Sequence, residues 1–308
     1  MSGTKFRLVT RSDFDGLVCA ALLKELNLIE QIAFAHPKDV QDGLVSLSSS
    51  DITTNLPYNP YVHLSFDHHY SETIRNIGRA PNCIIDPNAP SAARVVYNYY
   101  GGEKSFPNIS PTMMEAVDKA DSADFSPEDV RDPKGWVLLN FIMDPRTGLG
   151  RFHHFRIGNY AMMMELVEMC RNREIDEILQ NPDVKERIEL YREQDAKARK
   201  QIAQAATVRD KVVVLDFRGL EQIWCTNRFT VYEMFPDCNV SIHVLDGRLR
   251  RNTVLAVGKS IFNRTSNANI GEIMLSFNGG GHRNAGTCQI ANDKTESTLE
   301  QVLHRLAF

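Results

Sequence analysis

The hydrophobic pattern at the start of the chain predicts a strand, a turn and a helix. Lys5–Thr10 has the pattern of a short strand, and Gly16–Leu26 has that of an apolar-rich helix that follows an acidic turn. Further short strands are predicted at Ile52–Leu56 and Val62–Phe66. A strand–turn–helix unit followed by more short strands favours an α/β domain.

Three later segments have helical patterns. Ser91–Tyr100 begins just after a proline, and Thr112–Ala120 follows it as a second helix. Asn159–Met169 is apolar and rich in methionine. Methionine at helical spacing usually fills irregular gaps in a core, so we interpret this stripe as core packing.

The pattern changes in the last 120 or so residues. Asp183–Ala206 is strongly polar, contains many Glu, Lys and Arg residues and has no Gly or Pro, which predicts a long exposed helix. Strands are then predicted at Lys211–Phe217, Val240–Leu245 and Thr253–Val257. We therefore expect three parts, namely a first domain at 1–182, a helical linker at 183–210 and a smaller α/β domain at 211–308.

Composition and charge narrow the classes of protein. The apolar share of 43% and the charged share of 24% are typical of a folded globular chain. The net charge of −4 argues against a protein that coats long duplex DNA. It is compatible with a local basic pocket that binds a small phosphorylated ligand. The sequence contains no run of 18 apolar residues, so no membrane span is predicted. The six cysteines are scattered without a C-x-x-C pair, so we expect buried thiols and a cytoplasmic protein.

Two carboxylates, Asp13 and Asp15, follow the first predicted strand. Ligands of α/β folds bind at the carboxyl ends of strands. Two carboxylates in one turn repel each other, and a divalent cation such as Mg²⁺ or Mn²⁺ would relieve that repulsion. The alternative is that Asp15 caps the helix that follows.

A second cluster, Asp67-His68-His69, follows the strand predicted at Val62–Phe66. An acid followed by two imidazoles at a strand end can combine a metal ligand, an orienting group and a proton donor. The alternative is a surface loop with two solvated histidines.

A third cluster contains Asp118, Asp121 and Asp124 at the end of a predicted helix. Negative charge is unfavourable at a helix C-terminus, so these acids invite a functional explanation. A solvated loop is the alternative for this cluster taken by itself.

In this order the three clusters resemble the DHH phosphoesterase family, which is named for the Asp-His-His found here at 67–69. Residues Gly279–Gly286 (GGGHRNAG) resemble the glycine-rich signature of the companion DHHA1 domain. The resemblance implies an α/β fold of two lobes, a parallel-sheet DHH domain and a smaller DHHA1 domain. It also implies that a helical linker joins the lobes and that the active site lies in the cleft.

The resemblance also implies roles for individual residues. A metal, Mn²⁺ or alternatively Mg²⁺, would activate water for hydrolysis of a phosphoester. Its ligands would be Asp13, Asp15, His68 and Asp121, with Asp118 competing for the last position. Asp67, His68, His69 and Arg11 would form the catalytic set. Substrate would contact Gly279, Gly280, Gly281, His282, Arg283, Asn284 and Arg264.

Two positions depart from the family pattern. The position where members usually have a histidine or an acid is occupied by Arg11 or by Val9, and neither is a normal metal ligand. Asn55 stands where we expect an acid that bridges two metals. Asp51 is the nearest carboxylate, but it lies at the other end of the predicted strand. The site would therefore hold one ion or two, and Arg11 could instead bind a phosphate oxygen.

We therefore expect a metal-dependent phosphohydrolase that cleaves a short oligonucleotide, a cyclic dinucleotide or phosphoadenosine phosphate. The alternatives are an exopolyphosphatase or pyrophosphatase, and a catalytically weak protein that senses a nucleotide. The departures at Arg11 and Asn55 support the sensor. The expected partner is a small phosphorylated or nucleotide substrate, not long duplex DNA or a membrane. A homodimer is a possible oligomeric state.

Overall fold

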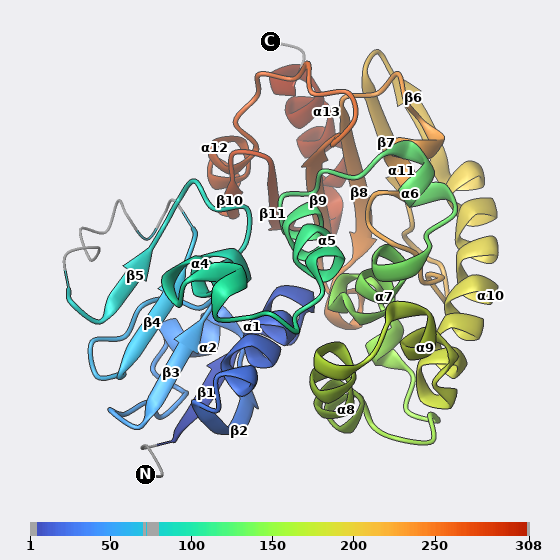
Figure 1. The fold of residues 1–308 in the computed structure, drawn as a ribbon. Helices are drawn as coiled ribbons and strands as arrows, with labels where there is room; N and C mark the ends of the chain where they lie inside the picture. Colours follow the sequence, from blue (N-terminus) through green and yellow to red (C-terminus); the bar gives the residue numbers. More distant parts are fainter. Residues whose placement is uncertain (1–4, 70–71, 73–79, 307–308) are drawn as a thin grey trace. The chain divides into compact units, whose positions relative to one another are not determined.

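The computed structural model describes residues 5–69, 72 and 80–306, and in this part the chain forms two sheets in two compact units (Figure 1). The first unit contains Met1–Phe125 and Pro133–Leu190, and the second contains Ser126–Asp132 and Tyr191–Phe308. The polar segment expected to be helical forms α10 (Pro182–Ala205), and the division falls within this helix. A separate linker at 183–210 stays a prediction.

The first unit contains a five-stranded sheet in the order β2-β1-β3-β4-β5, and every pair of neighbours is parallel. The expected α/β class is therefore confirmed. The order reverses between β1 and β3, and ligands of open parallel sheets bind at such a reversal, outside the carboxyl ends of the strands. The strands are β1 (Phe6–Thr10), β2 (Ile29–Phe34), β3 (Asp51–Thr54), β4 (Leu64–Asp67) and β5 (Cys83–Ile85).

Helix α1 (Phe14–Glu25) is the central helix of the first unit, because every residue from Phe14 to Leu23 is buried. A helix that is apolar all round must be covered on all sides. It packs against α4 (Ala92–Tyr99), α5 (Pro111–Asp121) and α8 (Asn159–Asn172). The shorter helices of this unit are α2 (Pro37–Gln41), α7 (Gly135–Met143) and α9 (Ile175–Gln180).

The methionine stripe on α8 is part of the core, as expected. Met162, Met163 and Met169 are all buried. Met162 and Met163 also line a cavity that is described below.

The start of α1 differs from the expectation. The helix begins at Phe14, and Asp13 rather than Asp15 is its N-cap, with Oδ1 accepting a hydrogen bond from the Gly16 amide at 3.0 Å. A Cβ on Gly16 would lie 2.1 Å from the Arg11 carbonyl oxygen, so only glycine allows this tight turn. Because Asp13 caps the helix, Asp15 lies in its first turn and is available for other contacts.

The second unit contains a six-stranded mixed sheet in the order β10-β11-β9-β8-β7-β6. Only β7 and β8 are parallel among its neighbouring pairs in the described residues. The strands are β6 (Ala206–Arg209), β7 (Val212–Asp216), β8 (Val240–Asp246), β9 (Thr253–Lys259), β10 (Gly280–His282) and β11 (Ala285–Ile290).

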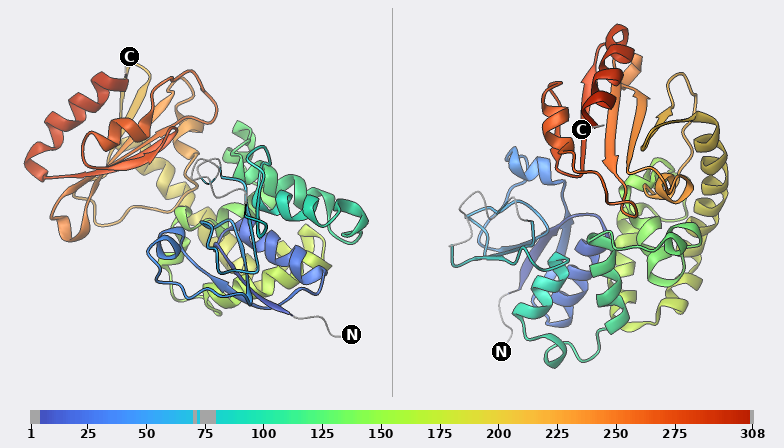
Figure 2. Two further views of the ribbon diagram at one scale, coloured as in Figure 1. Left: turned by 90° about the vertical axis from the view of Figure 1, so that its left-hand side faces the viewer. Right: turned by 90° about the horizontal axis from the view of Figure 1, so that it is seen from above.

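Two helices complete the core of this second sheet. Ile270 and Met274 of α12 (Ile270–Leu275) join one apolar cluster with buried strand residues such as Val214, Ile242 and Leu255. Leu299 and Val302 of α13 (Thr295–Leu306) belong to the same cluster, and Figure 2 shows α13, in red, along one face of the sheet. The short helices α6 (Pro127–Arg131) and α11 (Thr230–Met234) also belong to this unit and pack together.

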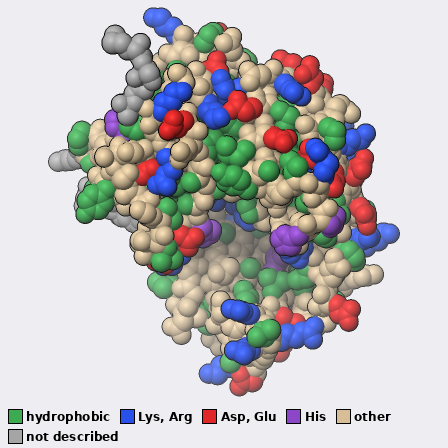
Figure 3. All heavy atoms as spheres, turned by 90° about the horizontal axis from the view of Figure 1, so that it is seen from below, with side chains coloured by type: hydrophobic (Ala, Val, Ile, Leu, Met, Phe, Trp, Pro, Cys, Tyr) green, Lys and Arg blue, Asp and Glu red, His purple; other side chains and the backbone are tan. Residues whose placement is uncertain are grey.

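The surface agrees with the balanced composition. On the face drawn in Figure 3, acidic and basic side chains are interspersed and do not form a continuous basic stripe. All six cysteines are buried and unpaired, as expected. Among the described helices, none has the length and apolar character needed to cross a membrane.

Candidate active site

Asp15, His68 and Asp121 gather at the carboxyl ends of the parallel strands, and Asp13 lies near them without joining the group of ligand atoms. Asp13 and Asp15 follow β1, and His68 follows β4. Asp121 comes from the last residue of α5. Ligand atoms of Asp15, His68 and Asp121 all lie within 4.8 Å of one another.

Asp15 is fixed by the start of α4. Its Oδ2 accepts a hydrogen bond from the Ala92 amide at 3.1 Å, and its Oδ1 accepts one from the Ala93 amide at 2.8 Å. The positive end of the helix dipole favours a carboxylate at this point. Nevertheless, burial and the charges of Asp121 and Asp13 raise the pKa of Asp15 well above its ordinary value. Negative charge is therefore concentrated in a place with little solvent.

Asp13 is likewise a buried carboxylate with a raised pKa. Burial raises the pKa of Asp13 above its ordinary value, the nearby charge of Arg11 opposes that shift, and Asp121 adds to it. The Arg11 Nε atom lies 3.1 Å from Asp13 Oδ2. Arg11 therefore already compensates part of the negative charge, as a permanent cation.

His68 and Asp121 face each other at ligand distance. His68 Nδ1 lies 3.2 Å from the Ala89 carbonyl oxygen, which can only accept, so Nδ1 donates there and Nε2 faces Asp121. Nε2 is 2.8 Å from Asp121 Oδ2, yet it is buried without a hydrogen-bond partner of acceptable geometry among the described residues. A histidine held by a carbonyl through one nitrogen, with the other nitrogen aimed at carboxylates, is the usual arrangement of a metal ligand.

Asp118 has a different environment. Its carboxylate accepts a hydrogen bond from Arg94 Nε at 2.8 Å and another from Ser91 Oγ at 2.7 Å. Ser91 is the N-cap of α4, so Asp118 supports the start of that helix. Of the two competing acids, the structure places Asp121 in the cluster and Asp118 in a structural ion pair.

Asp67 orients the other two residues of the Asp67-His68-His69 cluster. Its Oδ1 accepts a hydrogen bond from the His68 amide at 2.8 Å and lies 2.8 Å from His69 Nδ1. Asp67 is buried, whereas the His69 side chain is 42% exposed. The carboxylate fixes the proton on Nδ1, which leaves His69 Nε2 as the nitrogen that can exchange a proton with a ligand.

Asn55 directly follows β3 and is almost fully buried, with its backbone in the left-handed region at φ +55°. Both polar atoms of its side-chain amide are buried without a hydrogen-bond partner among the described residues. Asp51 lies at the opposite end of β3, where it pairs with Arg7 Nε at 2.6 Å and accepts from the Ser48 amide. Asp51 therefore cannot replace a carboxylate at the position of Asn55.

Arg146 is a further cation that acts on the acidic cluster. Asp144 Oδ1 accepts a hydrogen bond from Arg146 Nε at 2.8 Å, and the Arg146 side chain is about half exposed. Burial lowers the pKa of Arg146, but the charges of Asp144, Asp13 and Asp121 outweigh it and raise the pKa above its ordinary value. Arg146 is therefore electrostatically coupled to the acidic cluster from the segment that follows α7.

These observations agree with a cation-binding site. Carboxylate oxygens and an imidazole nitrogen are donors that suit Mn²⁺ and Mg²⁺. The repulsion among the three carboxylates and the unsatisfied His68 Nε2 are both features that a bound divalent cation would relieve. The residues whose ligand atoms lie close enough together to hold it are Asp15, His68 and Asp121, and Asp13 contributes a nearby negative charge.

In the second unit, the glycine-rich segment forms a β-hairpin instead of an open loop. Residues 280–282 pair with residues 285–287, and Arg283 and Asn284 form the turn. His282 is exposed and is therefore accessible to a ligand. The Lys259 amide donates to the Asn284 carbonyl at 2.9 Å, which places Lys259 beside the turn that contains Arg283, and burial and the charge of Arg283 lower the pKa of Lys259. Arg264 is exposed, and its Nε donates to the Ile261 carbonyl at 2.9 Å.

The glycines of the hairpin have different roles. A Cβ on Gly281, at φ +153°, would lie 2.3 Å from the Ala285 carbonyl oxygen, whereas a Cβ on Gly280 would have no neighbour within 4 Å. We expect Gly281→Ala to lower the free energy of unfolding by about 1–3 kcal/mol. Gly280→Ala should change it by less than about 0.5 kcal/mol. Chemical denaturation of both variants checks this, and equal stabilities would contradict the hairpin geometry.

Several proteins of known structure are similar to this chain. It is 53% identical to the pGpG-specific phosphodiesterase PggH from Vibrio cholerae, with 98% of this chain and 99% of that chain covered and a TM-score of 0.89. RecJ from Thermus thermophilus in complex with Mg²⁺ is 13% identical, with 99% and 50% covered and a TM-score of 0.51. CDC45 from Entamoeba histolytica is 9% identical, with 99% and 96% covered and a TM-score of 0.50. No family model and no curated protein matches.

The match to PggH extends over nearly all of both chains, while the RecJ and CDC45 structures share the fold alone. The protein is a hydrolase that acts on phosphoester bonds. The chain belongs to the DHH phosphoesterase family, and the resemblance based on its sequence motifs is thereby confirmed.

Proposed function

We propose that this chain hydrolyses the linear dinucleotide pGpG to two molecules of GMP in a reaction that requires a divalent metal, preferably Mn²⁺. The observation that carries the proposal is the 53% identity to a pGpG-specific phosphodiesterase over nearly the full length of both chains. The cluster of buried acids and histidine at the strand ends supports it independently, since a divalent cation held by such groups can activate water for hydrolysis of a phosphodiester.

The proposed metal ligands are Asp13, Asp15, His68 and Asp121. A bound divalent cation supplies an activated water and neutralises charge on the phosphate oxygens. We propose one ion rather than two, because Arg11 contributes a positive charge beside Asp13 and Asn55 contributes no negative charge after β3.

The remaining residues of the cluster act on the substrate. In the proposed reaction, water adds to phosphorus and the bond from phosphorus to the 3′-oxygen breaks. His69 Nε2 donates a proton to that leaving oxygen, and Asp67 holds the ring in the required orientation. Arg11 and Arg146 bind non-bridging phosphate oxygens, for which a guanidinium provides several donors in one plane.

The hairpin of the second unit is proposed to bind an anionic part of the substrate. Arg283 and Lys259 supply neighbouring positive charges, and the open Cα of Gly280 permits close approach of a ligand. The other residues proposed to take part, from the sequence pattern, are Gly279, Gly281, His282, Asn284 and Arg264.

A substrate panel tests the proposal. The purified chain is incubated with Mn²⁺ and pGpG, cyclic di-GMP, phosphoadenosine phosphate or polyphosphate, and products are separated by chromatography. We expect GMP from pGpG, with kcat/KM at least about tenfold above that of every other substrate. A site that binds all of pGpG discriminates against substrates that lack some of its groups. Faster release of phosphate from polyphosphate would overturn the proposal. Tight binding of pGpG without release of GMP would favour the sensor, to which Arg11 and Asn55 point.

A further inference from the structure

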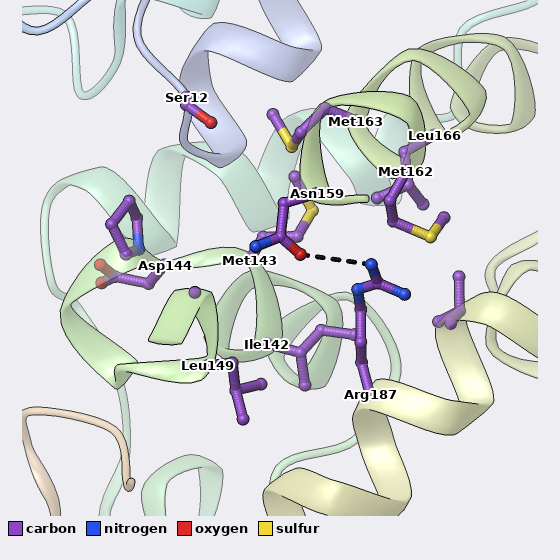
Figure 4. A pocket seen from close by; sticks show the side chains of 13 residues that line it. Ser12, Ile142, Met143, Asp144, Leu149, Asn159, Met162, Met163, Leu166 and Arg187 are labelled. Atoms are coloured by element: carbon purple, nitrogen blue, oxygen red, sulfur yellow. Dashed lines mark hydrogen bonds between the residues drawn. The ribbon is translucent and has the colours of Figure 1, made fainter. Parts of the chain in front are cut away.

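A cavity of about 210 Å³ lies within the first unit, beside the turn that carries Asp13 (Figure 4). Ser12 of that turn lines one side of it, between Arg11 and Asp13 in the sequence. The opposite side is formed by Arg187 of α10. The volume is below the roughly 300–1,000 Å³ of pockets for drug-sized ligands, so it suits a small ligand.

The walls of the cavity are mainly apolar. Leu149, Met162, Met163 and Leu166 line it and are all buried. Thioether side chains adapt to flat surfaces and make favourable contacts with aromatic rings. Walls of this kind accept a planar ring more readily than a multiply charged phosphate.

Arg187 gives the cavity a positive charge. The residue is 4% exposed, and its guanidinium donates hydrogen bonds to the carbonyl oxygens of Asp183 at 2.9 Å and Ile157 at 2.8 Å. It also donates to Asn159 Oδ1 at 3.2 Å, and Figure 4 shows these two side chains pointing toward one another at the cavity. The guanidinium stacks on the ring of Phe155, 4.2 Å from its centroid.

The charge of Arg187 is only weakly compensated. Among the described residues, the ion pair recorded for it is with Glu186, at 4.0 Å. Burial lowers the pKa of Arg187, with carboxylates at longer range opposing the shift. Three of its five N–H groups are engaged in the hydrogen bonds above, and in the part of the chain that the structure describes the other two make no hydrogen bond, so they are available to a ligand with acceptor atoms.

The segment between Gly150 and Asn159, which both line the cavity, has the sequence RFHHFRIG. The rings of Phe152 and His154 lie 5.8 Å apart, and those of His154 and Phe155 lie 5.3 Å apart. Aromatic and basic side chains interleaved in this way are typical of surfaces on which nucleobases stack.

We infer that this cavity binds a guanine base of the substrate, with Arg187 donating to O6 or N7 and the methionines of α8 contacting the ring face. The inference rests on the proposed function, because pGpG supplies a guanine on each side of the phosphate that reacts. Guanine presents two acceptors, N7 and O6, on one edge, whereas adenine presents one acceptor and one donor there. The cavity therefore selects guanine over adenine.

Binding of guanosine and adenosine to the full chain tests this inference, because neither nucleoside carries a phosphate. Isothermal titration calorimetry should show guanosine binding at least about tenfold more tightly than adenosine, as expected for a well-formed contact between arginine and guanine. Equal affinities, or no binding of guanosine, would overturn the inference. A failure to hydrolyse pGpG would instead refute the proposed function, so the two failures are distinguishable.

Two variants of α8 locate the binding site. Met163→Phe fills the cavity, and Met169→Phe changes a buried methionine of the same helix that does not line it. We expect Met163→Phe to weaken guanosine binding at least about tenfold, and Met169→Phe to leave it within twofold of the unmodified chain, with thermal unfolding confirming that both are folded. Equal effects of the two variants would place guanosine elsewhere.

Arg187 is tested by its effect on base preference. In Arg187→Met, the ratio of guanosine to adenosine affinity should fall to about one, because the donors to O6 and N7 are lost. If Arg187→Met does not fold, Arg187→Lys serves, since lysine keeps the charge but lacks the fork of donors. A preference for guanine that survives in the folded variant would refute the role of Arg187.

Discussion

Asp121→Asn should abolish most hydrolysis of pGpG, lowering kcat/KM by more than about 100-fold. Loss of a group that only supports a metal ligand costs about 10–100-fold in affinity or activity, and Asp121 is placed as a ligand itself. Its Oδ2 lies 2.8 Å from His68 Nε2, within the set of atoms that could share one cation. The measurement is kcat/KM for pGpG with Mn²⁺, together with the affinity of the variant for Mn²⁺.

Asp118→Asn is the matched control, because it makes the same chemical change three residues earlier on α5. Asp118 pairs with Arg94 and Ser91 instead of the cluster. This variant should lose about 1.5–3 kcal/mol in free energy of unfolding and keep most of its affinity for Mn²⁺. If Asp118→Asn lost the metal and Asp121→Asn retained it, the assignment of the two acids would be reversed.

The double variant Arg11→His, Asn55→Asp should raise the content of Mn²⁺ from one ion to two per chain. It removes the positive charge 3.1 Å from Asp13 and adds an imidazole ligand in its place. It also adds a carboxylate at the buried Asn55 position, where two polar atoms now have no hydrogen-bond partner in the described structure. Carboxylate and imidazole are both donors that suit Mn²⁺.

The metal content is measured by elemental analysis after equilibration with Mn²⁺ and gel filtration. Each single variant serves as a control, and we expect each to bind fewer ions than the double variant because one of the two substitutions is missing. Two tightly bound ions in the unmodified chain would show that Arg11 and Asn55 do not prevent occupancy of a second position.

The positions of Asp13 and Asp15, and of Asp67 and His68, were predictable because each pair lies next to a strand in the sequence. Acids directly after a strand of a parallel sheet must lie at its carboxyl edge, so the order of Asp13, Asp15, Asp67 and His68 in the sequence placed them together. The strands before these residues have apolar patterns that identify them. The family resemblance then supplied the chemistry, and the comparison with PggH confirmed the family.

The choice between Asp118 and Asp121 was not predictable from the pattern along α5. Both acids lie near the end of one helix, three residues apart, and therefore on neighbouring parts of its surface. Their roles are separated only by tertiary partners, Arg94 for Asp118 and His68 for Asp121. Such partners are far away in sequence and leave no local signal.

Short or polar strands were missed for a related reason. β2 contains Glu30 and Gln31 within an apolar pattern, and β10 consists of two glycines and a histidine. Their strand conformation depends on pairing with β1 and β11, which outweighs their weak intrinsic preference. The hairpin was therefore expected only as a glycine-rich loop.

The cavity did leave a signal in the sequence. Val184, Ile188 and Tyr191 form a buried stripe on α10 at helical spacing, and Arg187 lies on the same stripe. The charge of an arginine within an apolar stripe must be paired within the protein or must bind a ligand, since a buried charge without partners is costly in free energy. The segment was predicted only as an exposed helix, and the arginine within its apolar stripe is the signal that would have identified the cavity.

The most direct measurement is the turnover of pGpG by the full chain after removal of metal with a chelator, followed by titration with Mn²⁺. We expect no release of GMP from the metal-free protein, and restoration of turnover in proportion to Mn²⁺ up to about one ion per chain. Release of GMP at an undiminished rate by the metal-free protein would show that the reaction does not need the metal. Intact pGpG after Mn²⁺ has bound would contradict the proposed hydrolysis of this dinucleotide.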